Sequence, residues 1–518
     1  MNGAGALIRT LSAAGVEVCF ANPGTSEMHF VAAVDDVPEM RSILGLFEGV
    51  VTGAADGYAR MADKPAATLL HLGSGLGNGL ANLHNARRAA SPLVNIVGDH
   101  ATYHAQYDAP LQSDIETVAK NCSGWIGRPE SPVEVGPVAA AAVAAATGPP
   151  GQVATLILPA DASWGEGAEP AAPVAPTPRS RVDEATIDAV AGALRSGEKT
   201  VVLVGGSVLR GDGLRAANRI ATATGAQVLG ETFPARLERG AGVPALDRLQ
   251  YLAEFAAMQL DGAKHLVLAD AKSPVSFFAY PDKPSDLVPD GCEVHTLAGG
   301  SDDAVAALEA VAELVATDVE PTVPALARPD LPTGALTAEM VAAAVGALLP
   351  DDCIVVDESN TSGLWAPGAT AGCPPHDWLT LTGGAIGIGL PLATGAAVGG
   401  GGRPVVCLGS DGSSMYTFQA LWTQAREALD VTTIIFNNSS YAVLNLELSR
   451  VGAGEPGPKA LDMLDLTRPD LDFVALAKGC GVDDAVRVTT GEEMADALGR
   501  ALASPGPSVI EAVVPRAI

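Results

Sequence analysis

The sequence predicts an α/β protein built from parallel sheets that are flanked by helices. Short runs rich in Val, Ile and Leu alternate along the chain with longer segments of helical periodicity. This alternation is typical of parallel sheets covered by helices on both faces. The runs expected to form strands are 68–72, 93–98, 153–159, 200–206, 265–270, 353–358, 404–409, 431–436 and 508–514.

Two stretches without hydrophobic periodicity, 163–182 and 317–334, are rich in Pro and Ala. Segments of this composition act as semi-rigid connectors between domains. The chain of 518 residues is long enough for about three domains. We therefore expect domains over 1–165, 183–318 and 335–518.

Composition narrows the class of protein. The formal net charge of −29 argues against nucleic acid or an anionic membrane as a partner. The seven cysteines are scattered without a Cys-x-x-Cys pair, which favours buried thiols in a reducing compartment. The N-terminus does not resemble a signal peptide, and no apolar run reaches the ~18 residues of a membrane span. We expect a cytoplasmic protein.

Polar residues directly follow two of the expected strands, 404–409 and 431–436. A helix expected over 418–429 joins them as a parallel crossover, so both carboxyl ends lie at one edge of the sheet. Ligands bind at that edge in open α/β sheets. Asp411 and Asn438 offer a carboxylate and an amide oxygen there, and Mg²⁺ prefers such donors.

Gly412, Ser413 and Ser414 follow Asp411 and are expected to open a helix, whose free N–H groups bind phosphate. The alternative is that this segment is only a tight turn with an N-cap. The Asn-Asn loop after the next strand favours a site for a metal and a diphosphate.

The segment resembles the thiamine-diphosphate-binding motif, which is usually Gly-Asp-Gly followed by Asn-Asn. Ser410 stands where the first glycine is usual, a departure that leaves the ligands in place. The resemblance implies that Asp411 and Asn438 ligate Mg²⁺ by side chain and Ser440 by its carbonyl. It also places Tyr441 and Ala442, with Gly412, Ser413 and Ser414, among the residues that bind the cofactor.

A second half-site is expected because a carboxyl group must hydrogen-bond the aminopyrimidine of thiamine in a dry pocket. Glu48 is the candidate, since it ends an apolar run and precedes a helix of small residues. The alternative is a carboxylate favoured at a helix start by the dipole, although Glu is a poor N-cap.

The runs ANPGTSEMHF (21–30) and DGYARMADKPAATLLHLGSGLGNGLANLHNA (56–86), with Glu48 between them, resemble the N-terminal domain of the thiamine-diphosphate-dependent decarboxylase and acetolactate synthase family. The resemblance covers nearly the whole chain and is weak in the middle. It implies a first domain that binds the pyrimidine, a Rossmann-like central domain and a last domain that binds the diphosphate. It further implies a homodimer or homotetramer, with Glu48 of one subunit facing Asp411 of another.

Two more segments are expected near the cofactor. In 380–397 the resemblance places Ile386 where a bulky residue bends the cofactor, and Gly384 where a carbonyl meets its amino group. Asn360 and Thr361 lie on a loop after an expected strand and could hold the diphosphate. A polar turn is the alternative for that loop.

The substrate is expected to be a small 2-oxoacid. ANPGTSE and LLHLGSG resemble benzoylformate decarboxylases, with Thr25 at a serine position and His71 at a catalytic histidine. Those enzymes use a second histidine from the central domain, whereas 273–284 has none and places Phe278 or Ala279 there. A buried, satisfied histidine is the alternative for His71.

The general pattern resembles acetolactate synthase large subunits throughout, and we expect an acetolactate synthase-like lyase or transferase, with benzoylformate decarboxylation as the alternative. Acetolactate synthases bind FAD in the central domain, but 205–213 is only a glycine turn, so FAD is not expected here. A non-catalytic relative would lack Glu48. A nucleotide-binding dehydrogenase would need a glycine spacing that 73–79 does not have.

Overall fold

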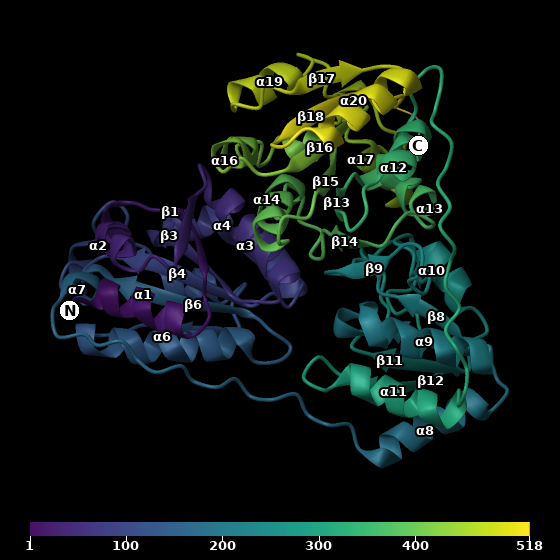
Figure 1. The fold of residues 1–518 in the computed structure, drawn as a ribbon, viewed down its shortest axis with the longest axis horizontal. Coiled ribbons are helices and arrows are strands. Elements are labelled where there is room, and N and C mark those ends of the chain that lie inside the picture. Colours follow the sequence, from purple (N-terminus) through teal and green to yellow (C-terminus); the bar gives the residue numbers. More distant parts are fainter. Residues whose placement is uncertain (517–518) are drawn as a thin grey trace.

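The computed structural model describes residues 1–516 and arranges them around three sheets (Figure 1). The first sheet has the order β2-β1-β3-β4-β6-β5, and all its pairs are parallel. Its strands are β1 (Val18–Asn22), β2 (Arg41–Leu44), β3 (Ala66–His71), β4 (Leu93–Asp99), β5 (Trp125–Gly127) and β6 (Val153–Pro159). Its helices are α1 (Gly3–Ala13), α2 (Met28–Ala33), α3 (Glu48–Ala62), α4 (Leu72–Arg88), α5 (Ile115–Ala119), α6 (Pro132–Thr147) and α7 (Ala160–Trp164), with one-turn helices η1 (Thr25–Glu27), η2 (Val34–Asp36) and η3 (Ala105–Tyr107).

The second sheet has the order β10-β8-β7-β11-β12 and is also parallel. Its strands are β7 (Thr200–Val204), β8 (Gln227–Gly230), β10 (Asp247–Arg248), β11 (His265–Ala269) and β12 (Glu293–Ala298). The helices around it are α8 (Glu184–Arg195), η4 (Gly206–Leu209), α9 (Gly211–Thr224), α10 (Ala253–Leu260) and α11 (Ala304–Val315).

The third sheet has the order β17-β18-β16-β15-β13-β14-β9. Its strands are β9 (Leu237–Arg239), β13 (Ile354–Glu358), β14 (His376–Thr380), β15 (Val405–Ser410), β16 (Val431–Asn437), β17 (Ala485–Val488) and β18 (Ser508–Val513). Its helices are α12 (Ala338–Leu348), η5 (Asn360–Gly363), α13 (Ala366–Ala369), α14 (Gly389–Gly399), α15 (Asp411–Ser414), α16 (Ala420–Arg426), α17 (Ala442–Arg450), α18 (Pro458–Asp462), α19 (Phe473–Gly479) and α20 (Gly491–Ala503).

The α/β fold class is confirmed, and each of the nine expected runs contains a strand. These strands are buried because helices cover both faces of their sheets. On the first sheet α3 and α4 pack against one face, and α1 and α6 enclose a separate apolar cluster on the other. A strand covered on both sides needs mostly apolar residues on both of its faces, which explains the continuous runs in the sequence.

One strand differs from the expectation of parallel sheets. β9 comes from the middle of the chain, yet it pairs antiparallel with β14 at the edge of the third sheet. Its three residues give almost no periodic signal, so the pairing is decided by tertiary packing. The middle segment is therefore not confined to its own sheet. The domain limits at 165, 183, 318 and 335 stay a prediction.

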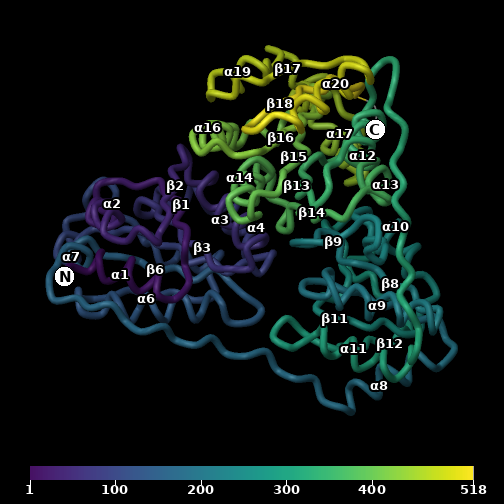
Figure 2. The backbone as a smooth tube through the Cα atoms, in the orientation of Figure 1, coloured from purple at the N-terminus to yellow at the C-terminus, as the bar shows by residue number. Residues whose placement is uncertain are grey.

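The proline-rich stretches form no helix or strand over 165–179 and 318–334. Figure 2 shows both as extended links that run along the outside of the molecule. Within residues 1–516, no helix combines the length and the apolar character that crossing a membrane requires.

Helices α3 and α14 connect the first and third sheets within one chain (Figure 1). Glycines allow the close approach: a Cβ atom on Gly57 would overlap the Leu392 carbonyl, and one on Gly395 would overlap the Ala54 carbonyl. Small residues on both helices thus replace the usual ridge of side chains.

The free energy of unfolding should depend on pH in part through the buried His376 on β14. Burial lowers its pKa from 6.5 to about 4. The unfolded chain therefore binds a proton that the folded chain does not, and stability is lost as the pH falls from 6.5 through 4. The loss from this residue is at most about 3 kcal/mol.

The variant His376→Asn retains a donor for the Pro374 carbonyl, which lies 2.8 Å from Nδ1, but it does not titrate. Chemical unfolding between pH 7 and pH 4 should show a weaker acid dependence in the variant. An unchanged slope would contradict the assignment.

Candidate active site

The expected metal and diphosphate loop lies at the carboxyl edge of the third sheet. β15 and β16 are parallel neighbours, with Ser410 opposite Phe436. Asp411 is the residue after β15, and Asn438 is the residue after β16. The register therefore brings both expected ligands to one edge, as the crossover argument predicted.

Two polar atoms beside this loop are buried without a partner. The Oδ1 atom of Asp411 accepts the Gly412 N–H at 2.7 Å, but its Oδ2 atom has no partner. The Ser414 hydroxyl is also unpartnered. Burial raises the pKa of Asp411, against the backbone N–H groups around it. An unpaired buried polar atom costs about 1–3 kcal/mol, which a bound cation and phosphate would remove.

The other expected ligands keep some donor capacity. The Asn438 side-chain oxygen accepts the Ser440 N–H at 3.0 Å, and the Ser440 carbonyl accepts the Ala442 N–H at 2.8 Å. Each oxygen retains a second lone pair. A free carboxylate oxygen with two such oxygens is a donor set that suits Mg²⁺, so the residues fit the expected metal.

The helix after Asp411 is shorter than the sequence suggests. α15 is a single turn, and α16 covers only part of the expected 418–429. One turn aligns few peptide dipoles, so the expected dipole attraction for phosphate is small here. The backbone N–H groups of this turn and the unpartnered Ser414 hydroxyl remain as groups that could hold a phosphate.

The glycine-rich segment before α14 is held by α4 of the same chain. Asn85 donates to the Ala385 carbonyl at 2.8 Å and accepts from the Gly383 N–H at 3.1 Å. The His84 Nε2 atom donates to the Gly383 carbonyl at 3.1 Å. Gly384 adopts a positive φ of 72°, and Ile386 is half-buried. The carbonyl of Gly384 has no donor within residues 1–516, which leaves it available to a ligand.

Glu358 also holds this segment, and sequence reasoning missed it. It ends β13 and is buried, and its carboxylate accepts the N–H groups of Gly387, Ile388 and Gly389 at 2.6–3.1 Å. The sequence feature that could have revealed Glu358 is its position at the end of an expected strand. The next loop contains Asn360, whose amide donates to the Ser410 hydroxyl at 3.1 Å, and the half-buried Thr361.

The expected catalytic carboxylate begins α3. Glu48 is 9% exposed, and its Oε2 atom accepts a hydrogen bond from Asn78 of α4 at 3.0 Å. Its Oε1 atom lies 3.1 Å from the position that a Cβ atom of Gly75 would take. The Glu48 side chain is therefore directed at the first turns of α4 and makes no hydrogen bond to the backbone at the start of α3. A simple N-cap role does not describe it.

His71 ends β3 and pairs with a carboxylate that the sequence did not reveal. Its Nδ1 atom lies 2.8 Å from Oε2 of Glu27, which also accepts the Gly24 N–H at 2.7 Å. Glu27 is fully buried, and burial raises its pKa while the Gly24 N–H and His71 oppose that rise. The two residues are 44 positions apart, so no spacing rule connects them.

The structure brings Glu48, His71 and the Thr25 loop together. The Cβ position of Gly75 is 3.1 Å from Glu48 Oε1 and 3.6 Å from His71 Cβ. Thr25 opens η1, the turn that also supplies Glu27, and it is exposed. Glu48 and His71 thus lie at the start of α4, and Gly24, the residue before Thr25, lies against the His71 ring. Two other histidines of this segment pair with aromatic rings: His29 lies beside Trp164, and His100 beside His104.

The middle of the chain adds an aromatic group to this region. Phe277, not Phe278 or Ala279, approaches the glycine-rich segment, because a Cβ atom on Gly384 would lie 2.6 Å from its ring. Phe277 contacts the rings of Phe233, Tyr251 and Phe278. The expectation that Phe278 or Ala279 stands at the position of the second histidine of benzoylformate decarboxylases stays a prediction.

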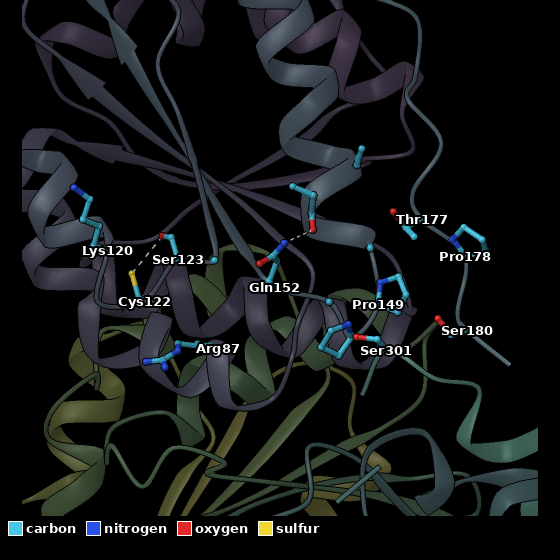
Figure 3. A pocket seen from close by; sticks show the side chains of 16 residues that line it. Arg87, Lys120, Cys122, Ser123, Pro149, Gln152, Thr177, Pro178, Ser180 and Ser301 are labelled. Carbon is cyan, nitrogen blue, oxygen red and sulfur yellow. Dashed lines mark hydrogen bonds between the residues drawn. The ribbon is translucent and has the colours of Figure 1, made fainter. Parts of the chain in front are cut away.

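A cavity of about 670 Å³ lies elsewhere (Figure 3). Its walls include Arg87 and Lys120 of the first segment, Thr177 of the linker and Ser301. None of the expected site residues lines it, so it does not belong to the candidate active site.

Comparison with known proteins agrees with this geometry. A model of the N-terminal domain of thiamine pyrophosphate enzymes matches residues 1–120, and a model of their C-terminal domain matches residues 361–512. IlvX of Mycobacterium tuberculosis, named provisionally as an acetolactate synthase large subunit, is 64% identical over 99% of both chains. The chain belongs to the thiamine pyrophosphate enzyme family.

Other members of this family are named as decarboxylases. A benzoylformate decarboxylase of Pseudomonas aeruginosa is 30% identical over 96% of both chains. The structure of a 4-hydroxybenzoylformate decarboxylase of Rhodococcus jostii RHA1 superposes with a TM-score of 0.85 at 26% identity, covering 99% of each chain. Membership of the family agrees with thiamine diphosphate as cofactor and excludes the dehydrogenase alternative.

The Asp411→Asn variant tests the metal half-site. We expect the affinity for thiamine diphosphate in the presence of Mg²⁺ to fall by at least about 100-fold, because the free carboxylate oxygen is lost. Titration calorimetry measures this. The metal-free variant should unfold at the same or a higher temperature, since it buries no unpaired charge.

The matched control is Asp430→Asn, at the opposite end of β16, where the side chain is exposed. It should leave cofactor affinity unchanged. Equal affinities in wild type and Asp411→Asn would contradict the proposed role of Asp411.

Proposed function

We propose that this protein is a Mg²⁺- and thiamine-diphosphate-dependent enzyme that decarboxylates a 2-oxoacid and returns a proton to give an aldehyde. The observations that support this most are the nearly buried Glu48 carboxylate directed at Gly75 of α4 and the His71–Glu27 pair at the end of the neighbouring strand β3. One carboxylate suits activation of a cofactor, and a histidine with a buried carboxylate suits proton transfer near neutral pH.

The bound cofactor would supply a carbanion at C2 and accept the electron pair that CO₂ leaves. Around it, Glu48 would hydrogen-bond the aminopyrimidine ring, with Asn78 fixing the orientation of the carboxylate. Gly384 would offer its carbonyl, and Ile386 an apolar contact. Asp411, Asn438 and Ser440 would hold Mg²⁺, and Gly412, Ser413 and Ser414 the diphosphate.

The His71–Glu27 pair would deliver the proton that releases the product. Glu27 accepts from Nδ1, which leaves Nε2 of His71 as the nitrogen free to face a substrate. The pair is tightly enclosed: Cβ atoms built on Gly24 and Gly98 would overlap the His71 ring and the Glu27 carboxylate. Such enclosure fixes the imidazole in one orientation, as proton transfer requires.

An aromatic or other apolar side chain on the 2-oxoacid suits the surroundings. Phe277 and Phe278 are 42% and 53% exposed, and Phe277 contacts Gly384. Aromatic rings in this position would favour an apolar substrate group over a charged one. The decarboxylases of aromatic 2-oxoacids among the relatives agree with this.

Carboligation is the second candidate, because the 64% identical IlvX carries an acetolactate synthase name. In that reaction a second carbonyl compound takes the place of the proton, and the same residues would prepare the cofactor. No FAD is required for the decarboxylation proposed here.

We also propose that the active site is shared between two subunits of a homodimer or homotetramer. Within one chain, the hydrogen-bond partner of the Glu48 carboxylate is Asn78 of its own segment. Large apolar side chains next to the site residues are exposed: Leu46, Trp365 and Tyr416 are 47%, 53% and 53% exposed. A partner subunit would cover such residues.

Product analysis tests the reaction. The protein with thiamine diphosphate and Mg²⁺ is given benzoylformate and pyruvate separately, and NMR follows the products. We expect benzaldehyde from benzoylformate. Glu48→Gln should still bind the cofactor but lose about 10²–10⁴-fold in turnover, whereas Glu39→Gln, an exposed carboxylate nearby, should be unaffected.

Acetolactate from pyruvate, without benzaldehyde, would favour the second candidate. A fully active Glu48→Gln, or no consumption of either substrate, would argue against the proposal.

Subunit sharing is tested by mixing two inactive variants, Glu48→Gln and Asp411→Asn, and allowing the chains to exchange. If sites are shared, a mixed dimer has one intact site, and about a quarter of the wild-type activity should return. If each chain forms its own site, mixing restores nothing.

A further inference from the structure

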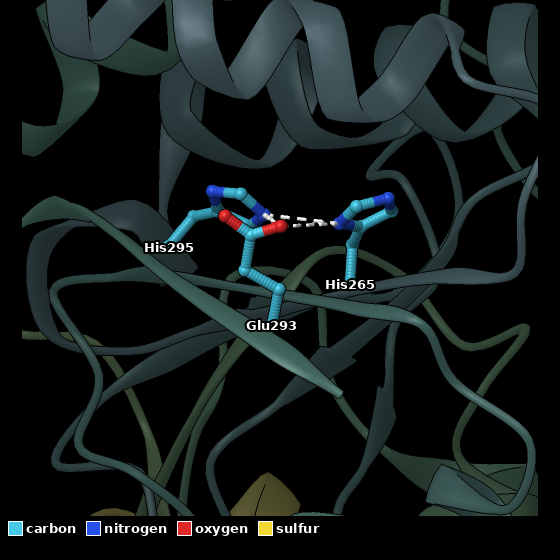
Figure 4. A group of neighbouring side chains, drawn as sticks. All are labelled: His265, Glu293 and His295. Atoms are coloured by element: carbon cyan, nitrogen blue, oxygen red, sulfur yellow. Dashed lines mark hydrogen bonds and ion pairs between the residues drawn. The ribbon is translucent and has the colours of Figure 1, made fainter. Parts of the chain in front are cut away.

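Three side chains in the second sheet form a compact group away from the candidate active site (Figure 4). His265 begins β11, and Glu293 and His295 lie on β12, the edge strand beside it. The register pairs His265 with Glu293, and the alternation of a strand directs Glu293 and His295 to the same face. The group is thus set by backbone pairing at the amino ends of the strands.

The spacing is close to what a metal requires. His265 Nδ1 lies 3.0 Å from His295 Nε2, and Glu293 Oε2 lies 3.8 and 3.9 Å from these nitrogens. Two nitrogens bound to one tetrahedral Zn²⁺ are about 3.3 Å apart. The imidazoles are mostly buried, with 13% and 14% of the side chains exposed, so they are held in place. The Glu293 side chain is 69% exposed, and a small movement of its carboxylate would bring Oε2 to a metal held by the two histidines.

A second carboxylate fixes the orientation of one imidazole. Nε2 of His265 lies 3.2 Å from Oε2 of Glu198, the residue that precedes β7 by two positions. A carboxylate that accepts the outer N–H of a ligating histidine is a usual feature of metal sites. With that proton on Nε2, His265 directs the lone pair of Nδ1 toward the centre of the group. His295 then donates to it when no metal is present.

We propose that His265, Glu293 and His295 bind a divalent transition metal such as Zn²⁺, with Glu198 positioning His265. Two imidazoles and one carboxylate are donors for Zn²⁺ or Co²⁺, whereas Mg²⁺ prefers oxygen alone. To bind, His295 moves its proton from Nε2 to Nδ1, and both nitrogens then face the metal. The fourth position is left to water, because the group is open on the side of the exposed Glu293.

The consequence is structural. The metal would tie the edge strand β12 to β11, at the ends of the strands opposite to those where ligands usually bind in such sheets. The site shares no residue with the Asp411 loop. Metal binding here would therefore stabilise the central segment without being part of the active site.

The test is a titration of the metal-free full-length protein with Co²⁺ and with Zn²⁺, in excess Mg²⁺ and without thiamine diphosphate. We expect one Co²⁺ per chain with the visible absorption of nitrogen ligation, displaced by one equivalent of Zn²⁺. His265→Ala and His295→Ala should lose this ion. The exposed Glu293→Gln, which leaves the fold intact, should weaken binding at least 10-fold, and Glu198→Gln about 10–100-fold.

Controls locate the ion. His104→Ala removes one member of another histidine pair, His100 and His104, and should leave Co²⁺ binding unchanged. Asp411→Asn should also retain it, because the proposed Mg²⁺ site is separate. Failure of wild type to bind either ion, or unchanged binding in the Glu293→Gln and His295→Ala variants, would show that the two histidines only share a hydrogen bond.

Discussion

The contact between α3 and α14 fixes the first and third sheets relative to each other within one chain. Backbone meets backbone at Gly57 and Gly395, so side chains larger than glycine at these positions would force the two helices apart. A buried ion pair, Asp56 with Arg60, lies on α3 at this junction, and Arg60 also donates to the Thr380 carbonyl at 2.7 Å. Removing one member of such a pair typically costs about 3–5 kcal/mol, so the junction is specific as well as close.

Both helices begin at the same end of this contact, next to α4. The Asn82 amide is 2.7 Å from the Gly49 carbonyl and 3.4 Å from the Gly387 carbonyl, one at the start of each helix. Helix α4 thus has two roles: its first turns contact Glu48, and its last turns hold the glycine-rich segment. A single helix thus joins Glu48 to the glycine-rich segment of its own chain, whereas the shared-site proposal pairs Glu48 with the Asp411 loop of another subunit.

Several buried polar atoms in this region lack hydrogen-bond partners, which lowers the stability of the folded protein. Glu27 Oε1, Asp411 Oδ2 and the Ser414 hydroxyl have no partner among residues 1–516. Each lies beside a residue that chemistry of this kind would use, and such local costs are expected at functional sites. The surrounding sheets offset this loss of stability, because their strands are buried on both faces and their backbone groups are paired.

The sequence by itself indicated nine of the strands found in residues 1–516 and the family, and it predicted where along the chain the metal ligands would lie. Burial on both faces produces continuous apolar runs, and Asp411 and Asn438 follow two of these runs directly, so local pattern was enough. Tertiary structure alone decided the rest. His71 meets Glu27 across 44 residues, β9 joins a distant sheet, and Phe277 rather than Phe278 reaches Gly384. These contacts depend on how surfaces fit in three dimensions, and no periodicity along the chain records that fit.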